Sequence, residues 1–394
     1  MKFSEKQISL LYVIDGLEFG GGERVFLQLA SNLRKRYRVV VASKSNGPFA
    51  SELNKLGIKL LSVNMSKQLT FKPIRQLRNI IHQNDINLVH SQGARADFFA
   101  RLASRGTNAP HIICTVAMPV EGFEVGPWRK RIYRLMDQLS ERYVDRFVVV
   151  SDVLKQTLTV GRSIDAQRVV RIYNGIELDQ YRLDLQDTGL RNQWNIPPSV
   201  PLIGAIGRLV WQKGFEYFIE AIPRILSTLP ETTFLIVGDG PLLDNLGGLA
   251  RKLGVENKVV FAGFRNDIQN VLATMDIIAV PSVLEGFPMV TLEAMAMAKP
   301  IIASNIQGIS EQIVDGEEGI LIPPRNPEAI AAEVSRLIDD RELSLKLAAA
   351  ARRKVERHFS VEKMVRETEE VYLSLVKAKG CKQSDCHGAG LKYR

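Results

Sequence analysis

The sequence predicts an α/β protein built from two parallel-sheet domains, each covered by helices on both faces. The chain has 394 residues, which exceeds the roughly 250–300 at which one hydrophobic core usually stops growing. Short apolar runs alternate with longer amphipathic stretches along nearly the whole chain, and this rhythm is typical of parallel βαβ units. Such sheets bind ligands beyond the carboxyl ends of their strands, so the residues that follow each apolar run are the candidates for a site.

Composition narrows the class of protein. With 45% hydrophobic and 24% charged residues the chain resembles an ordinary globular protein. No apolar run approaches the ~20 residues that span a bilayer, and charges occur where a signal peptide would be apolar, so we expect a cytoplasmic protein. The net charge of +9 favours an anionic partner. Nucleic acid ranks last because no zinc-finger spacing or RNA-binding aromatic motif occurs.

Seven apolar runs in the first half are the predicted strands of the first domain. They cover residues 8–14, 38–43, 58–63, 88–91, 112–116, 146–151 and 169–173. Polar and irregular residues follow from 187 to 198, which indicates a domain connection. We therefore predict domains at 1–185 and 186–360, then a helix at 361–378 that crosses back onto the first domain, and a disordered tail at 379–394.

A glycine-rich turn follows the first predicted strand. Gly20, Gly21 and Gly22 lack side chains and would let the backbone approach a bulky polar ligand. The pattern is neither G-x-G-x-x-G nor a P-loop, so a plain flexible turn is an equal alternative. Farther along, His90 closes a predicted strand, where a lone histidine is more often structural than catalytic.

The stretch 127–146 predicts a helix with apolar residues at helical spacing and basic residues in its first turns. The favoured interpretation is a helix packed on the sheet with a solvated charged face. The alternative is a peripheral contact with an anionic membrane, because basic residues beside Trp and Tyr suit that interface. The apolar positions are Trp128, Ile132, Leu135, Met136, Leu139 and Tyr143, and the basic ones are Arg129, Lys130, Arg131 and Arg134.

The second half starts a new alternating series at Leu202. Arg208 and Lys213 follow its first predicted strand, and two cations there could offset the charge of an anionic group such as a diphosphate. Two further predicted strands end near Gly240 and Arg265. Taken as isolated residues, Arg208 and Lys213 would be expected to lie in solvent.

The stretch 281–300 joins a strand end, a turn and a helix start, and it carries Glu285 and Glu293 eight positions apart. Pro288 is expected to open a helix that runs from Met289 to Met297. Unpaired backbone N–H groups at such a helix start attract an anion such as a diphosphate. Glutamates taken alone are usually solvated, so the surrounding pattern has to decide their role.

That pattern, P-S-x-x-E-G-x-P-x-x-x-L-E-A-M-A-x-x-x-P, resembles the E-x7-E signature of family 4 glycosyltransferases, which are retaining enzymes with nucleotide-sugar donors. The resemblance extends over residues 8–377 and implies a GT-B architecture, in which two Rossmann-like domains face each other across a cleft. The acceptor would bind mainly to the first domain and the donor to the second. No metal ion or cofactor is implied.

The resemblance also assigns roles to residues. Glu285, Arg208 and Lys213 would be catalytic, with Glu285 holding the donor sugar and the two cations binding the diphosphate. Glu293 would accept hydrogen bonds from the ribose. With Glu293, the donor-binding residues would be Arg208, Lys213, Gly240, Arg265, Phe287, Met289 and Val290. The residues between the acceptor and the diphosphate would be Gly21, Gly22, Glu23 and His90.

One position departs from the family pattern. Many relatives have a histidine after the strand at 112–116, where this chain has Ala117, Met118 and Pro119. The prediction is nevertheless a retaining transfer from a nucleotide sugar, with UDP favoured as the commonest nucleotide among relatives. The acceptor would be a lipid-linked or cell-surface glycan precursor, and the enzyme would work at the inner face of the membrane. Alternatives are a soluble disaccharide- or glucan-forming transferase, a nucleotide-sugar epimerase, and a non-catalytic donor-binding protein.

Overall fold

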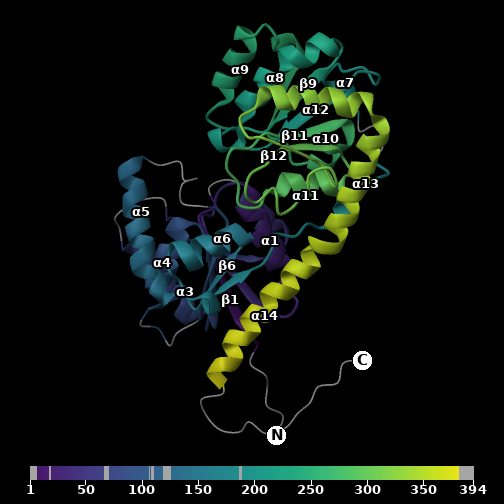
Figure 1. The fold of residues 1–394 in the computed structure, drawn as a ribbon. Coiled ribbons are helices and arrows are strands. Elements are labelled where there is room, and N and C mark those ends of the chain that lie inside the picture. Colours follow the sequence, from purple (N-terminus) through teal and green to yellow (C-terminus); the bar gives the residue numbers. More distant parts are fainter. Residues whose placement is uncertain are drawn as a thin grey trace, which may run out of the picture.

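Two α/β domains face each other in the computed structural model, and each has one parallel sheet at its centre (Figure 1). The structure describes residues 7–16, 19–65, 71–105, 107, 111–118, 126–185 and 189–380. Every strand pairing within the two sheets is parallel. The predicted fold class is confirmed.

The first sheet has seven strands in the order β3-β2-β1-β4-β5-β6-β7. Their bounds are β1 Ser9–Ile14, β2 Arg38–Ser43, β3 Lys59–Ser62, β4 Leu88–Gln92, β5 His111–Val116, β6 Arg146–Val149 and β7 Val169–Arg171. Each coincides with one of the predicted apolar runs. The central strands read as continuous apolar segments because helices cover both faces of a parallel sheet; all six residues of β1 are buried.

The second sheet has six strands in the order β10-β9-β8-β11-β12-β13. Their bounds are β8 Leu202–Ile206, β9 Thr233–Val237, β10 Val259–Gly263, β11 Ile277–Val280, β12 Ile301–Ser304 and β13 Ile320–Ile322. The first sheet ends with β7 and the second begins with β8. The boundary that we predict near residue 186 falls between them, and residues 186–188 lie outside the described part of the chain.

Helices connect the strands and cover the sheets. In the first domain they are α1 Gly21–Leu33, α2 Pro48–Lys55, α3 Lys72–Gln83, α4 Ala94–Ser104, α5 Pro127–Ser140 and α6 Asp152–Gln156. Then come α7 Leu190–Gln193, α8 Phe215–Thr228, α9 Leu243–Lys252, α10 Ile268–Thr274, α11 Met289–Ala296, α12 Pro327–Asp339, α13 Arg341–His358 and α14 Val361–Gly380. No helix of the described residues is both long and apolar enough to cross a membrane.

The strand order reverses at one place in each sheet, and these places position the site. In the first sheet the chain runs outward from β1 to β3 and then returns to β4, which lies on the other side of β1. In the second sheet it runs outward from β8 to β10 and then returns to β11, on the other side of β8. Crevices open at such reversals beyond the carboxyl ends of the strands. Helix α1 follows β1, and α11 follows β11, so both helix starts lie at these crevices.

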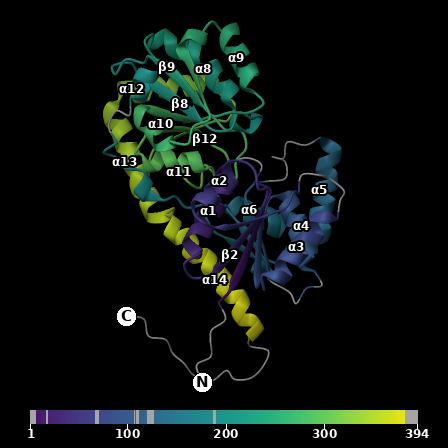
Figure 2. The ribbon, with the colours of Figure 1, turned by 180° about the vertical axis from the view of Figure 1, so that it is seen from behind.

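The last described helix, α14, returns to the first domain. Helices α13 and α14 run past both domains, as Figure 2 shows from behind. Inside the first domain, the Tyr372 hydroxyl lies 3.0 Å from the Tyr12 hydroxyl, and the Tyr37 hydroxyl donates a 2.6 Å hydrogen bond to Glu369. Helix α14 is therefore held by polar as well as apolar contacts with the first domain.

The cysteines divide between the core and the chain end. Cys114 is a free and fully buried thiol of β5, as expected for a core residue. Cys381 and Cys386 fall in the predicted tail, which lies outside the described residues.

Candidate active site between the two domains

The stretch 281–296 forms the centre of the candidate site. Strand β11 ends at Val280, a turn follows, and α11 begins at Met289 with Pro288 as its N-cap. Glu285 lies on the turn and Glu293 on the helix, and both are buried, with 6% and 4% of their surface exposed. Buried carboxylates need partners, because leaving a charge unpaired away from water is costly. Their contacts therefore show what surrounds the site.

Glu285 is held by two groups of its own domain. Lys213 Nζ donates a 2.6 Å bond to Glu285 Oε1, and Ser282 Oγ donates a 2.7 Å bond to the same oxygen. Lys213 closes the short turn Trp211–Lys213 after β8. The structure thus brings together two predicted catalytic residues that are 72 positions apart in the chain. A diphosphate that reached this place would share the Lys213 cation with Glu285.

Glu293 is held across the interdomain boundary. Its carboxylate forms an ion pair with Arg24 of α1, which belongs to the first domain. The Tyr181 hydroxyl donates a 3.1 Å bond to the same oxygen. Burial and the nearby Glu293 charge raise the pKa of Tyr181 above its ordinary value, so the phenol keeps its proton. Glu293 consequently ties α1 to α11.

The glycine loop brings a second helix start to the same place. Helix α1 begins at Gly21, and the Glu23 carboxylate accepts a 3.0 Å bond from the Gly20 N–H at the N-cap. A Cβ at Gly21 would lie 3.2 Å from Met289 Cγ, and one at Gly22 would lie 2.3 Å from Gln92 Nε2. The N-termini of α1 and α11 therefore meet. Two helix starts that converge form a region of positive potential suited to an anion.

The two domains touch through backbone at the turn beside Glu285. A Cβ at Gly286 would lie only 1.9 Å from the Ala117 carbonyl oxygen, at the end of β5. The Asn174 side chain donates a 3.1 Å bond to the Phe287 carbonyl. The Phe287 ring stacks on Tyr173 with 4.7 Å between centroids. Phe287, predicted to bind the donor, thus has its ring packed at the domain connection.

The remaining donor-side candidates lie at carboxyl ends of the second sheet. Arg208 follows β8 and is exposed. Gly240 packs against backbone, since a Cβ there would lie 2.6 Å from the Leu209 carbonyl oxygen. Arg265 donates two bonds to Asp267, of 2.8 and 2.6 Å, so its charge is already compensated. Met289 and Val290 open α11 and are largely buried, which leaves their backbone N–H groups as the polar feature of this turn.

His90 does not share the environment of the glycine loop. It is 3% exposed, and its two ring nitrogens lie 2.6 Å from the Tyr372 hydroxyl and 2.7 Å from the Thr115 hydroxyl. Burial lowers the pKa of His90 to about 3, so the ring stays neutral. These contacts favour the structural alternative, in which His90 fastens α14 to the first sheet.

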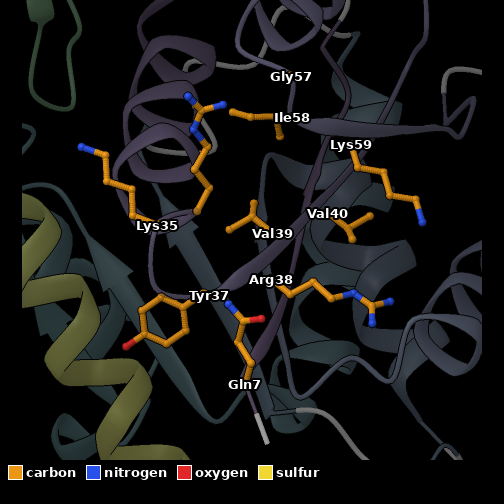
Figure 3. A pocket seen from close by; sticks show the side chains of 10 residues that line it. Gln7, Lys35, Tyr37, Arg38, Val39, Val40, Gly57, Ile58 and Lys59 are labelled. Carbon is orange, nitrogen blue, oxygen red and sulfur yellow. The ribbon is translucent and has the colours of Figure 1, made fainter.

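A separate basic hollow lies at the opposite end of the first sheet. The hollow has a volume of about 540 Å³. Figure 3 shows Lys35, Arg38 and Lys59 around it. Arg38 and Lys59 mark the amino ends of β2 and β3, whereas the candidate site lies at carboxyl ends. Both cations donate to Asn84 Oδ1, at 3.3 and 3.0 Å. The hollow therefore does not belong to the interdomain site.

Sequence reasoning missed three residues of the site. Arg24 and Tyr181 hold Glu293, and Ser282 holds Glu285. Arg24 directly follows the glycine loop and its glutamate, and this cation in the first turn of α1 was the available signal. Within the described ranges no group of three or more His, Cys, Asp or Glu side chains is arranged to hold a metal ion.

Two family profiles match the chain, one in each domain. "Glycosyltransferase Family 4" matches residues 19–180, and "Glycosyl transferases group 1" matches residues 186–354. The Escherichia coli UDP-Gal:alpha-D-GlcNAc-diphosphoundecaprenol alpha-1,3-galactosyltransferase is 24% identical over 389 residues, which are 95% of this chain and 99% of that relative.

Solved structures share the whole fold. A glycosyltransferase from Rickettsia africae ESF-5 matches with a TM-score of 0.80 and 25% identity, over 94% of this chain and 99% of its own. HepE of Anabaena, in complex with UDP and glucose, matches with a TM-score of 0.83 and 22% identity, over 93% and 100% of the two chains. Together with the two facing sheets, these matches confirm the predicted GT-B architecture.

Proposed function

Because the chain belongs to glycosyltransferase family 4, we propose that it transfers a sugar with retention of configuration, from a UDP-sugar to a hydroxyl of a lipid-linked glycan precursor. The observation that carries the proposal is the meeting of two helix N-termini beside the Lys213–Glu285 pair. A helix start and a nearby cation both favour a diphosphate. In this proposal Glu285 would contact the sugar attached to that diphosphate.

The proposed reaction breaks the bond between the anomeric carbon and the diphosphate oxygen, and forms a bond from that carbon to the acceptor oxygen. The acceptor hydroxyl attacks from the face that the diphosphate leaves, and its proton passes to a diphosphate oxygen. Lys213, Arg208 and the backbone N–H groups of Met289 and Val290 would stabilise the departing charge, without a metal ion or a cofactor. Positive charge growing on the sugar ring would be stabilised by Glu285.

Glu293 would bind the ribose hydroxyls of the nucleotide. Its carboxylate already accepts bonds from Arg24 and Tyr181. A carboxylate has about four lone-pair directions, so the ribose can join these partners or replace one. Donor binding in this proposal is therefore coupled to the contact between α1 and α11, and so to the closure of the two domains.

The choice of donor and acceptor is supported by the relatives. The E. coli relative is named for a UDP-galactose donor and a diphosphoundecaprenol-linked acceptor, and the HepE structure contains UDP. A lipid-linked acceptor would make this chain a peripheral enzyme at the cytoplasmic face of the membrane. Nucleotide-sugar donors with other bases, and soluble acceptors, are the alternatives that the experiment separates.

The test supplies purified protein with UDP-, GDP- and ADP-sugars in turn, with and without a lipid extract, and measures nucleotide release and product mass. We expect UDP release that the lipid extract stimulates, together with a product whose mass rises by one sugar. An altered nucleotide sugar formed without an acceptor would identify an epimerase instead. A donor that binds and stays intact under every condition would mean a non-catalytic donor-binding protein.

A further inference from the structure

Helix α5 carries a row of large apolar side chains that faces solvent. Trp128, Ile132, Leu135 and Leu139 are 79%, 52%, 55% and 61% exposed. Their spacing of four, three and four residues places them on one face of the helix. The sequence favoured a helix whose apolar side chains pack on the sheet. For these four side chains that prediction is wrong, because they are exposed. Among the six apolar positions of this stretch, Met136 and Tyr143 are half-buried and the other four are exposed.

The opposite face of α5 fixes this orientation. Asp137 accepts a 2.5 Å bond from Arg101 of α4 and a 2.7 Å bond from Arg162. Arg101 is 1% exposed, and its second contact on α5 is the Ser140 hydroxyl at 3.1 Å. A fully buried guanidinium is strongly destabilised if its carboxylate partner leaves. Helix α5 therefore cannot roll to bury its apolar row without breaking this network.

An apolar row that stays outside usually marks an interaction surface. Arg131 and Arg134 are exposed on the same helix, each one position before a residue of the row, so they lie about 100° around the helix on one flank. A tryptophan at one end of an apolar row, with arginines beside it, suits the boundary between lipid headgroups and acyl chains.

Charge decides between the candidate occupants. A second copy of the chain would bring another net charge of +9 and the same arginines to a self-complementary contact. An anionic lipid surface would complement both the row and its flank. Helix α5 also belongs to the domain on the acceptor side, and it follows β5, whose end meets Gly286 at the candidate site. Figure 1 shows α5 at the outer margin of that domain.

We propose that α5 is a membrane-docking helix, whose row of Trp128, Ile132, Leu135 and Leu139 inserts into the interfacial region of an anionic bilayer while Arg131 and Arg134 contact lipid phosphates. This inference deepens the proposed function by naming the surface from which the acceptor is taken. It rests on that function only for the identity of the acceptor.

The experiment measures co-sedimentation of the full-length protein with vesicles of phosphatidylcholine alone and of phosphatidylcholine mixed with phosphatidylglycerol. We expect binding to the anionic vesicles that weakens as salt rises. Leu135→Ser and Trp128→Ala should each weaken it about tenfold, because each removes apolar surface that would enter the bilayer. Arg131→Gln combined with Arg134→Gln should remove the preference for anionic lipid.

Leu345→Ser is the matched control, because Leu345 is 60% exposed on α13, outside α5. It should bind vesicles as the unmodified protein does, and thermal unfolding should show that every variant is folded. The proposal is overturned if the unmodified protein ignores anionic vesicles at low salt, or if Leu135→Ser and Leu345→Ser bind equally. A dimer that Leu135→Ser dissociates, without vesicle binding, would also overturn it and assign the row to a second copy.

A parallel assay separates this inference from the proposed function. Transfer to a short water-soluble acceptor should be the same for Leu135→Ser and the unmodified protein, since the row does not touch the candidate site. If the unmodified protein transfers sugar normally but does not bind vesicles, the membrane-docking proposal is wrong and the proposed transferase function stands. If it binds anionic vesicles but transfers sugar from no donor, the proposed transferase function is wrong and the membrane-docking proposal stands.

Discussion

Replacement of Gly286 by alanine tests the geometry of the site most directly. Gly286 belongs to the second domain, and the Ala117 carbonyl oxygen, 1.9 Å from the position that a Cβ would take, belongs to the first. Gly286 is not among the glycines with positive φ, so alanine can adopt its backbone conformation. The obstacle is purely steric, and it acts on the approach of the two domains.

The size of the effect follows from the distance. In the native structure the new Cβ would lie 1.9 Å from the Ala117 carbonyl oxygen, whereas ordinary van der Waals contact begins at 3.4 Å. The two segments would therefore have to move apart by about 1.5 Å, the difference between these distances. A displacement of about 1 Å in an active site can cost roughly 10²-fold in rate. We therefore expect Gly286→Ala to lower kcat/KM at least about 100-fold. Overpacking should cost about 1–3 kcal/mol of stability, because the clash lies at the contact between the domains and not within either sheet.

The assay is nucleotide release with the donor that the screen identifies, accompanied by thermal unfolding and by small-angle scattering to follow the separation of the domains. Gly161→Ala is the matched control, because it adds the same methyl group where nothing lies within 4 Å. It should leave both rate and stability nearly unchanged. A kcat/KM for Gly286→Ala within twofold of the unmodified protein would refute the argument that these two segments must touch during turnover.

Three further substitutions test single residues. Glu293→Gln should weaken UDP binding about tenfold in calorimetry, because the ribose would lose a charged acceptor; unchanged affinity would contradict the ribose assignment. Arg208→Ala should chiefly lower kcat, by about 10²-fold, and normal turnover in steady-state kinetics would rule out its role. His90→Leu concerns stability: the folded pKa near 3 lies below the ordinary 6.5, so the native protein loses stability as pH falls from 6.5 towards 3. At pH 5 this loss is about 2 kcal/mol, and urea unfolding at pH 7.5 and pH 5 should show a smaller difference for the variant. An equal difference in both proteins would mean that His90 is not responsible.

Local patterns in the sequence were enough to predict two parallel-sheet domains and the placement of the two glutamates, whereas the GT-B arrangement was implied by the resemblance to family 4. Buried parallel strands appear as short apolar runs, so all strands of the first sheet were found. Pro288 marks the start of α11 because its ring suits a helix N-terminus, and this put Glu285 on the turn and Glu293 on the helix. These features depend on neighbours in the chain, which a sequence displays.

The features that sequence reasoning missed depend on distant neighbours. Arg24 and Glu293 are 269 positions apart and come from different domains, so no spacing rule connects them. Helix α5 gives a second example, because periodicity shows that one face is apolar but not which way that face points. Its direction is set by the buried Arg101 and its bonds to Asp137, and no local pattern contains that pair.

Ala117 stands at the position where the family pattern has a histidine, and it contributes backbone to the contact between the domains. Its contribution to the domain contact is a carbonyl oxygen, which every residue type supplies, so alanine in place of the histidine expected from the family pattern leaves this contact intact. The partners of Glu285 and Glu293 also come from other residues. Under the proposed function, the alanine therefore bears on what an imidazole would touch beside the donor sugar or the acceptor, and its effect should appear in turnover rather than in nucleotide affinity.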